Sequence, residues 1–127
     1  MVRNPPADPL LITETSELAA FCDRLAGVPF IAIDTEFLRE KTYWPILCLI
    51  QIAGPEPDQV AAIDSLAPGL DLTPLFALLK APETVKVFHA ARQDVEIFFR
   101  LTGSVPKPIV DTQVLANDMY QQAFNNI

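Results

Sequence analysis

An apolar run in the N-terminal third of the chain leads directly into two acids and reads Phe30-Ile31-Ala32-Ile33-Asp34-Thr35-Glu36. A continuous apolar run of this kind is typical of a central strand that is covered on both faces. The two acids stand one residue apart, so on a strand both side chains point to the same side of the sheet. Because open α/β sheets bind ligands at the carboxyl ends of their strands, the segment predicts an α/β fold with a site at Asp34 and Glu36.

The apolar residues on either side of this segment follow strand and helix periodicity in turn. Further strands are expected at residues 10–12, 46–53, 59–64, 85–88 and 109–110. Helices are expected after the capping candidates Thr15 and Ser16, after Asp71 or Thr73, over residues 90–101, and from about Thr112 to Tyr120. The loop at residues 54–58 suits an antiparallel hairpin, and the later elements alternate between strand and helix. The order predicts a mixed sheet, an antiparallel meander followed by βαβ units, flanked by helices.

The composition is that of one small folded domain. The chain has 127 residues, of which 50% are hydrophobic and 20% charged, and this excludes an intrinsically disordered protein. No N-terminal signal is present and no apolar run is long enough to cross a bilayer, so we expect no membrane partner. Cys22 and Cys48 lie in apolar runs, which favours buried reduced thiols over a disulfide or metal pair. The sequence therefore predicts a soluble cytoplasmic protein.

The net charge of -7 argues at first against a protein that grips nucleic acid through a broad positive surface. This argument weakens if some of the acids hold cations, because bound divalent ions reverse the local field that a phosphate meets.

Asp94 is an acid in a position where an apolar residue is expected. It stands three, four and seven residues before Ile97, Phe98 and Leu101, and this spacing places it on the buried face of a helix. A buried carboxylate is costly unless a charge or a metal compensates it. A salt bridge or a cap to a loop amide remains the alternative to a functional role.

Asp34, Glu36 and Asp94 together suit a metal site. Close carboxylates ionise together only beside a positive charge, and a divalent cation such as Mg²⁺ or Mn²⁺ is the natural partner. Three inward carboxylates from a strand end and a facing helix fit a two-metal phosphoryl-transfer site, which makes phosphodiester hydrolysis the leading chemistry. The alternative for Asp34 and Glu36 is that both are solvated where the strand meets its loop.

Five short motifs in the chain resemble one known family. They are Ile31-Ala32-Ile33-Asp34-Thr35-Glu36-Phe37, Thr42-Tyr43-Trp44-Pro45, Leu49-Ile50-Gln51-Ile52, Val87-Phe88-His89-Ala90-Ala91-Arg92-Gln93-Asp94 and Val110-Asp111-Thr112-Gln113. In this order, from about Phe30 to Ala116, they resemble the ribonuclease D branch of the DEDD 3′-to-5′ exonucleases. The resemblance implies a ribonuclease H-like fold and stepwise removal of nucleotides from RNA 3′ ends, typically the trailers of transfer RNA precursors.

The resemblance also implies roles for single residues. Asp34, Glu36 and Asp94 would be the catalytic ligands of two divalent cations, Mg²⁺ or Mn²⁺. Thr35 and Phe37 would lie beside the terminal nucleotide of the RNA partner.

Four further motif residues have two interpretations each. Tyr43 and Trp44 would border the substrate groove, where aromatic faces stack on bases, or would pack against the proline that follows them. His89 would bind or orient the substrate, or would make a local hydrogen bond. Asp111 resembles a family signature, but with Thr112 it is interpreted as a helix cap rather than a metal ligand.

One part of the family pattern is missing from the sequence. The family has a third motif, a Tyr or His followed four residues later by Asp, but here Phe124 stands four residues after Tyr120. Residues 1–127 are therefore expected to form a partial 3′-to-5′ exonuclease domain, without the third motif and the C-terminal helical domain. Because catalytic groups act together, we expect the chain alone to be inactive or impaired. The alternatives are a non-catalytic nucleic-acid-binding or interaction module of the same fold and, less favoured by the motifs, a DNA-directed proofreading exonuclease.

Overall fold

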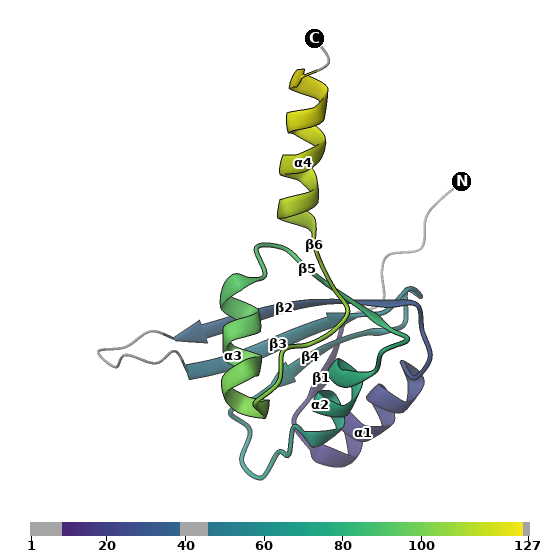
Figure 1. Cartoon of the computed structure of the whole chain (residues 1–127). Helices are drawn as coiled ribbons and strands as arrows, with labels where there is room; N and C mark the ends of the chain where they lie inside the picture. The colour runs from purple at the N-terminus through teal and green to yellow at the C-terminus, as the bar shows by residue number, and fades with distance from the viewer. Residues whose placement is uncertain (1–8, 39–45, 126–127) are drawn as a thin grey trace.

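A computed structural model describes residues 9–38 and 46–125 of the chain (Figure 1). Each expected strand and helix is present. In chain order the elements are β1 (Leu10–Ile12), α1 (Thr15–Arg24), β2 (Phe30–Leu38), β3 (Ile46–Ala53), β4 (Val60–Asp64), α2 (Thr73–Lys80), β5 (Val85–Phe88), α3 (Arg92–Thr102), β6 (Ile109–Asp111) and α4 (Thr112–Asn125). None of the described helices is long and apolar enough to span a membrane.

The six strands form one mixed sheet in the order β1-β4-β3-β2-β5-β6. The central strand β2 pairs antiparallel with β3 and parallel with β5, and β3 pairs antiparallel with β4. The pairs β1·β4 and β5·β6 are parallel. The predicted meander followed by βαβ units is thereby confirmed.

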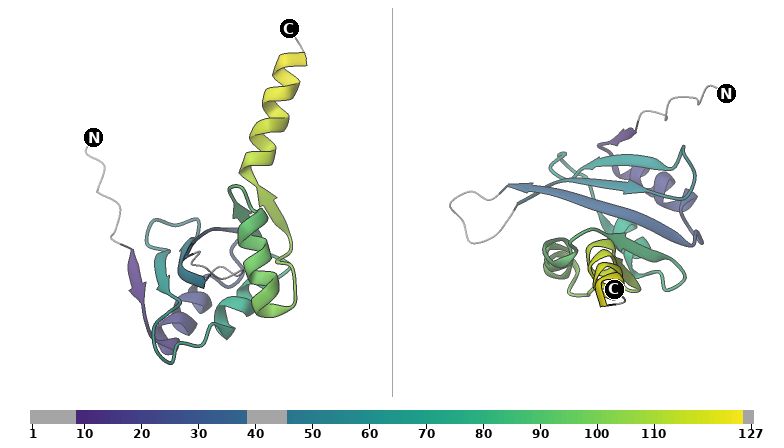
Figure 2. Two further views of the ribbon diagram at one scale, coloured as in Figure 1. Left: turned by 90° about the vertical axis from the view of Figure 1, so that its left-hand side faces the viewer. Right: turned by 90° about the horizontal axis from the view of Figure 1, so that it is seen from above.

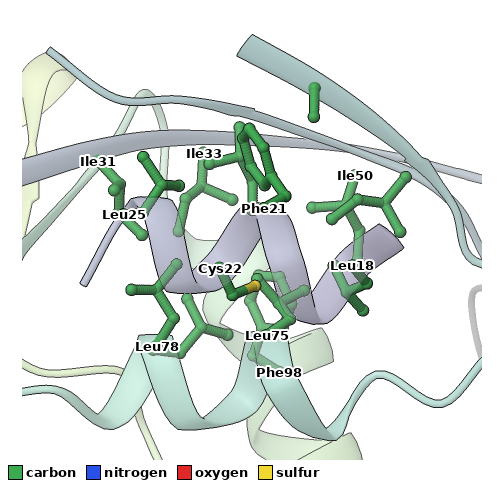
Figure 3. Close-up of a cluster of buried hydrophobic side chains, with 14 of the residues drawn as sticks. Leu18, Phe21, Cys22, Leu25, Ile31, Ile33, Ile50, Leu75, Leu78 and Phe98 are labelled. Carbon is green, nitrogen blue, oxygen red and sulfur yellow. The ribbon is translucent and has the colours of Figure 1, made fainter. Parts of the chain in front are cut away.

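The core lies between one face of the sheet and the helices α1, α2 and α3. Figure 3 shows Leu18 and Phe21 of α1 packed beside Leu75 of α2 and the strand residues Ile33 and Ile50. All five side chains are buried. Burial of each such side chain stabilises the fold by roughly 1.5–3 kcal/mol, so this layer holds the sheet and its helices together.

The opposite face of the sheet is not covered by any helix in the described part of the chain (Figure 2). Small and apolar residues of four neighbouring strands, among them Ala32, Ala53, Ala62 and Val87, line a hollow of about 670 Å³ there. The helix α4 projects away from the sheet (Figure 1). The expectation that the central strand is covered on both faces is therefore met on one face only.

The strand β2 is longer than the apolar run that predicts it. It continues to Leu38, since β3 pairs with it as far as the partners Leu38 and Ile46, with a bulge between Glu36 and Phe37. Asp34 and Glu36 accordingly lie within the strand, and the expectation that they stand at its carboxyl end is wrong. The long antiparallel ladder with β3 supplies backbone partners for these polar residues.

The helices begin differently from the predictions. At α1 neither Thr15 nor Ser16 caps the helix. The Thr15 hydroxyl instead accepts a hydrogen bond from the Asp71 amide at 2.9 Å, which joins α1 to the loop before α2. The helix α3 begins at Arg92 rather than at Ala90, because Ala90 has a φ of 56°, outside the helical region. At α2 the N-cap position is held by Leu72, without a side-chain cap bond, rather than by Asp71 or Thr73; Asp71, one residue earlier, accepts from the Thr73 amide at 2.9 Å.

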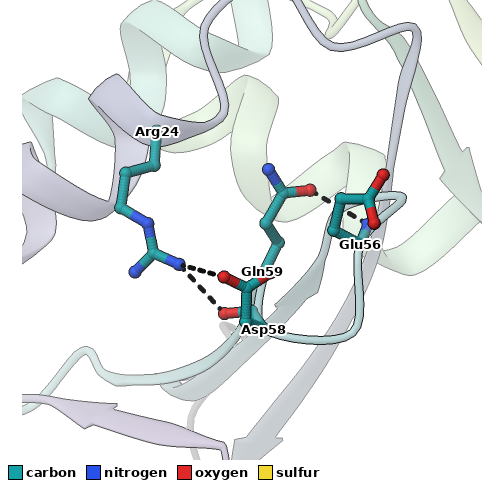
Figure 4. Close-up of polar contacts among 4 residues, drawn as sticks. All are labelled: Arg24, Glu56, Asp58 and Gln59. Carbon is teal, nitrogen blue, oxygen red and sulfur yellow. Dashed lines mark hydrogen bonds and ion pairs between the residues drawn. The ribbon is translucent and has the colours of Figure 1, made fainter.

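The hairpin between β3 and β4 is tied to α1 (Figure 4). Arg24 donates to the backbone oxygen of Asp58 at 3.1 Å and pairs with its carboxylate at 3.4 Å. Within the turn the Gln59 side-chain oxygen accepts from the Glu56 amide at 3.0 Å. Gly54 begins the turn, and its amide donates to the Gln59 carbonyl at 2.8 Å.

Gly54→Ala should destabilise the protein. A Cβ at this position would lie 2.6 Å from Gln59 Oε1 and 2.6 Å from a methyl of the buried Leu25. Overpacking of this kind costs roughly 1–3 kcal/mol, measured as the free energy of unfolding in urea. In a Gln59→Ala background the loss should be smaller, since one of the two clashes is gone. Equal losses in both backgrounds would contradict the steric explanation.

Candidate active site

Asp34 and Glu36 lie on the open face of the sheet. Burial alternates along β2: Ile33 and Thr35 are buried, whereas Asp34 and Glu36 are exposed. The prediction that both acids share one side of the strand is confirmed, but neither points inward to the core. Their partners across the ladder are Gln51 for Asp34 and Leu49 for Glu36.

Asp94 is buried in the first turn of α3, with 6% of its surface exposed, as its helical spacing predicts. Its Oδ1 accepts a hydrogen bond from the Thr35 hydroxyl. The expected alternatives were a cation or a loop amide, and the partner is instead a hydroxyl on the core face of the central strand. This bond joins β2 to α3 directly below the two exposed acids.

The surroundings of Asp94 disfavour the ionised form of its carboxyl group. Burial raises the pKa of its carboxyl above the ordinary value, and the negative charges of Asp34, Asp111 and Glu36 raise it further. The hydrogen bond from Thr35 lowers it in part. The field at this point is thus unfavourable for an anion and favourable for a cation.

The three predicted metal ligands do not converge. Within residues 9–38 and 46–125 no group of three His, Cys, Asp or Glu side chains is placed to hold a metal ion. Asp34 and Glu36 are hard oxygen donors on one face, which is the chemistry that Mg²⁺ and Mn²⁺ prefer, whereas Asp94 is turned to Thr35. The chemistry of the three side chains therefore suits a divalent cation. Asp34 and Glu36 are exposed on one face of the sheet, whereas the Asp94 carboxylate is bound to Thr35 on the core side.

The predicted substrate residues are placed unequally. The Thr35 side chain faces the core, and Phe37 is half-buried against it, so the nucleotide contacts of both stay predictions. Tyr43 and Trp44 lie outside the described residues. His89 is exposed at the end of β5, on the rim of the hollow that Asp34 also lines.

The local hydrogen bond of His89 is present. Its Nδ1 lies 2.9 Å from Thr112 Oγ1, and the same hydroxyl donates to the Phe88 carbonyl at 3.2 Å. A hydroxyl has a single proton, so His89 Nδ1 is the donor in this pair. In the neutral ring Nε2 is then the acceptor, which leaves the predicted substrate role chemically available.

Asp111 is a helix cap, as predicted. Its Oδ1 accepts from the Gln113 amide at 2.9 Å at the start of α4. The same carboxylate also accepts from the amides of Ala90 at 2.9 Å and Ala91 at 2.8 Å, which sequence reasoning missed. These bonds, led by that from Ala91, hold the pKa of Asp111 below its ordinary value.

Lys86 is a second residue that sequence reasoning missed. It is fully buried on β5, where Nζ donates to the carbonyls of Ala81 and, at 2.8 Å, of Lys107. Burial lowers the pKa of its ammonium, and the charge of Glu83 opposes this in part. The sequence did contain a sign of this buried residue, because Lys86 stands between Val85 and Val87 in a strand that is otherwise apolar. Its contacts are structural and join the end of α2 to the start of β6.

Comparisons with known proteins agree with the motifs. A 3′-5′ exonuclease family model matches residues 9–123. The chain is 59% identical over 109 residues to Ribonuclease D of Gluconacetobacter diazotrophicus, a match that covers 86% of this chain and 27% of that protein. The chain thus spans about a quarter of the length of the curated relatives it matches.

Solved structures give the same result. The fold superposes on the Escherichia coli RNase D, described as an exoribonuclease involved in structured RNA processing, with a TM-score of 0.79 and 41% identity over 86% of this chain and 28% of that one. The Trypanosoma brucei RNase D in complex with RNA U12 matches with a TM-score of 0.73 and 25% identity, over 86% of this chain and 39% of that one.

These matches confirm two predictions, the ribonuclease H-like mixed sheet and the resemblance to ribonuclease D. Enzymes of this family depend on divalent metal ions. The match over residues 9–123 spans nearly the whole chain and includes both acidic motifs. The chain belongs to the 3′-5′ exonuclease family.

Proposed function

We propose that the protein to which this chain belongs is a metal-dependent 3′-to-5′ exoribonuclease of the ribonuclease D type, acting on RNA 3′ ends such as those of transfer RNA precursors. The observation that carries the proposal is the arrangement around β2. Asp34 and Glu36 stand on its open face, and Asp94 is buried below them in the negative field of both. An acid is seldom retained in such a field unless a cation joins it.

Asp34, Glu36 and Asp94 are the residues that would hold the cations, Mg²⁺ or Mn²⁺. When bound, such ions activate water and stabilise the leaving oxygen of a phosphodiester. The hollow beside Asp34 supports the placement of a nucleotide there. Most of its lining side chains are apolar, and Gln51 and His89 add polar groups to them. His89 Nε2 can accept a hydrogen bond from a sugar hydroxyl there. Tyr43 and Trp44 remain the candidates for stacking on bases, and Phe37 for lying beside the terminal nucleotide.

A second function, a non-catalytic binding module of the same fold, is favoured by one observation. The carboxylates do not form a three-ligand group in the part of the chain that the structure describes. A module that has lost the chemistry need not bind Mn²⁺ at all. Titration of the chain with Mn²⁺, followed by the electron paramagnetic resonance of the free ion, separates the two functions if Asp34→Asn is titrated in parallel.

The exonuclease proposal is tested most directly in a chimera. The region of the Gluconacetobacter Ribonuclease D that matches this chain is replaced by the corresponding residues of this chain, since the two are 59% identical. We expect the chimera to release mononucleotides from a 3′-extended RNA with Mn²⁺, faster than from DNA of the same sequence. Asp34→Asn, Glu36→Gln and Asp94→Asn should each lower the rate about a hundredfold or more, because catalytic groups act as a unit.

The controls for this assay are Asp71→Asn in the same chimera and the 127-residue chain by itself. Asp71 lies outside the five motifs, where it accepts from the Thr73 amide at the start of α2, and its substitution should leave the rate unchanged. The isolated chain should release little, since the third motif of the family is missing from its sequence and is supplied by the rest of the chimera. An active chimera that tolerates Asp94→Asn would refute the assignment, and robust release by the isolated chain, abolished by Asp94→Asn, would refute its impairment.

Asp94 should also make stability depend on pH. Its folded pKa is raised above the ordinary 3.8. The unsubstituted parent chain is therefore most stable, relative to Asp94→Asn, below about pH 3.8. This advantage in the free energy of unfolding is lost as the pH rises through the folded pKa of Asp94. In urea denaturation with EDTA, Asp94→Asn should gain stability over the parent as the pH increases from 3 to 7.

Asp71→Asn is the matched control for this measurement. Hydrogen bonds from Thr73 lower the pKa of Asp71, so the parent gains stability above the ordinary pKa and loses it as the pH falls. The difference between Asp71→Asn and the parent should change with pH in the opposite direction. If the difference in the free energy of unfolding changed with pH in the same way for both variants, the fold would not raise the pKa of Asp94, and the prediction would be wrong.

A further inference from the structure

Two junctions of the fold lie side by side at one end of the sheet. The strands β5 and β6 are parallel neighbours, with Phe88 opposite Asp111. The turn of residues 89–91, which leads into α3, faces the junction of β6 and α4 at residues 111–112. The turn before α3 is followed directly by the first helical turn, which contains Asp94.

The Asp111 carboxylate binds both junctions at once. Oδ1 accepts from the Ala90 amide at 2.9 Å and from the Gln113 amide at 2.9 Å, and Oδ2 accepts from the Ala91 amide at 2.8 Å. A cap of α4 alone needs only the bond from Gln113. The two bonds from the turn are additional, and they hold the backbone immediately before α3.

Thr112 adds a second link between the same junctions. Its hydroxyl donates to the Phe88 carbonyl at 3.2 Å and accepts from His89 Nδ1 at 2.9 Å. Together Asp111 and Thr112 contact four consecutive residues, 88–91, and we name these contacts the junction clasp.

The turn needs such support because of its backbone. Ala90 has a φ of 56°, in the left-handed region that residues with a Cβ adopt only when their surroundings hold them there. The next residue, Ala91, is the N-cap of α3, and its carbonyl accepts the first hydrogen bond of the helix from the Val95 amide at 2.9 Å. Asp94 lies in this first turn. The position of its carboxylate is therefore set by the same peptides that Asp111 binds.

We propose that Asp111 is a positioning residue for Asp94: through the junction clasp it fixes the start of α3 and thereby the carboxylate that meets Thr35. The inference rests on the proposed function in so far as Asp94 is taken as a metal-binding acid. The competing view is that Asp111 merely caps α4.

Asp111→Asn separates these two views. Asparagine is as good a helix cap as aspartate, so α4 keeps its start. With its amide oxygen in the place of Oδ1, the asparagine keeps the bonds from Gln113 and Ala90 and loses the bond from Ala91. Thr112→Val removes the other half of the clasp and leaves the Asp111 carboxylate in place.

The experiment is amide hydrogen exchange by NMR on the ¹³C,¹⁵N-labelled 127-residue chain. We expect Asp111→Asn to accelerate exchange at Ala91 and Val95 at least tenfold, since a charge-assisted hydrogen bond is lost. The side-chain ¹³C signal of Asp94, which reports its bond to Thr35, should shift at the same time. Thr112→Val should shift the Asp94 signal less, because both Asp111 bonds to the turn remain.

Asp71→Asn is the control, because Asp71 binds the start of α2 as Asp111 binds that of α4. It should change exchange at Thr73 and leave Ala91, Val95 and the Asp94 signal unmoved. The proposal is overturned if Asp111→Asn alters exchange in α4 alone, or if the Asp94 signal stays in place while Ala91 exchanges faster. Neither readout requires bound metal, so failure to bind Mn²⁺ would count against the proposed function and not against the clasp.

Discussion

The hydrogen bond from Thr35 to the buried Asp94 is the interaction on which the arrangement of the site depends. It joins the central strand β2 to α3 across the core, where an apolar pair would be more stable. Since Thr35 lies between Asp34 and Glu36 on a strand, its inward side chain requires that both of these acids point outward. One bond thus fixes which face of the sheet carries the exposed carboxylates and which side receives α3.

The two faces of β2 have separate tasks. The core face packs against α1, α2 and α3 and supplies the stability of the domain. The open face carries Asp34 and Glu36, and Asp34 lines an apolar hollow whose rim includes His89. The strained turn at Ala90 and the Asp111 carboxylate then place α3 relative to both. Charge, burial and backbone strain are all concentrated within this small region of the fold.

Periodicity was sufficient to predict the sheet, the shared side of Asp34 and Glu36, and the burial of Asp94, because each of these follows from local spacing. It could not show that β2 continues to Leu38, since that depends on pairing with β3. The partner of Asp94 and the second role of Asp111 were missed for the same reason. Both are contacts between residues far apart in the chain, and a sequence pattern gives no distance between them.

The central claim is that the exposed face of β2 at Asp34 and Glu36 is where a divalent cation binds. The most direct measurement is paramagnetic broadening of amide signals as Mn²⁺ is added to the ¹⁵N-labelled chain. The signals of residues 34–36 should be lost first, ahead of those beside other exposed acids such as Asp23 and Asp58, and Asp34→Asn should remove this preference. Broadening that begins elsewhere, or that affects all exposed acids alike, would contradict the claim.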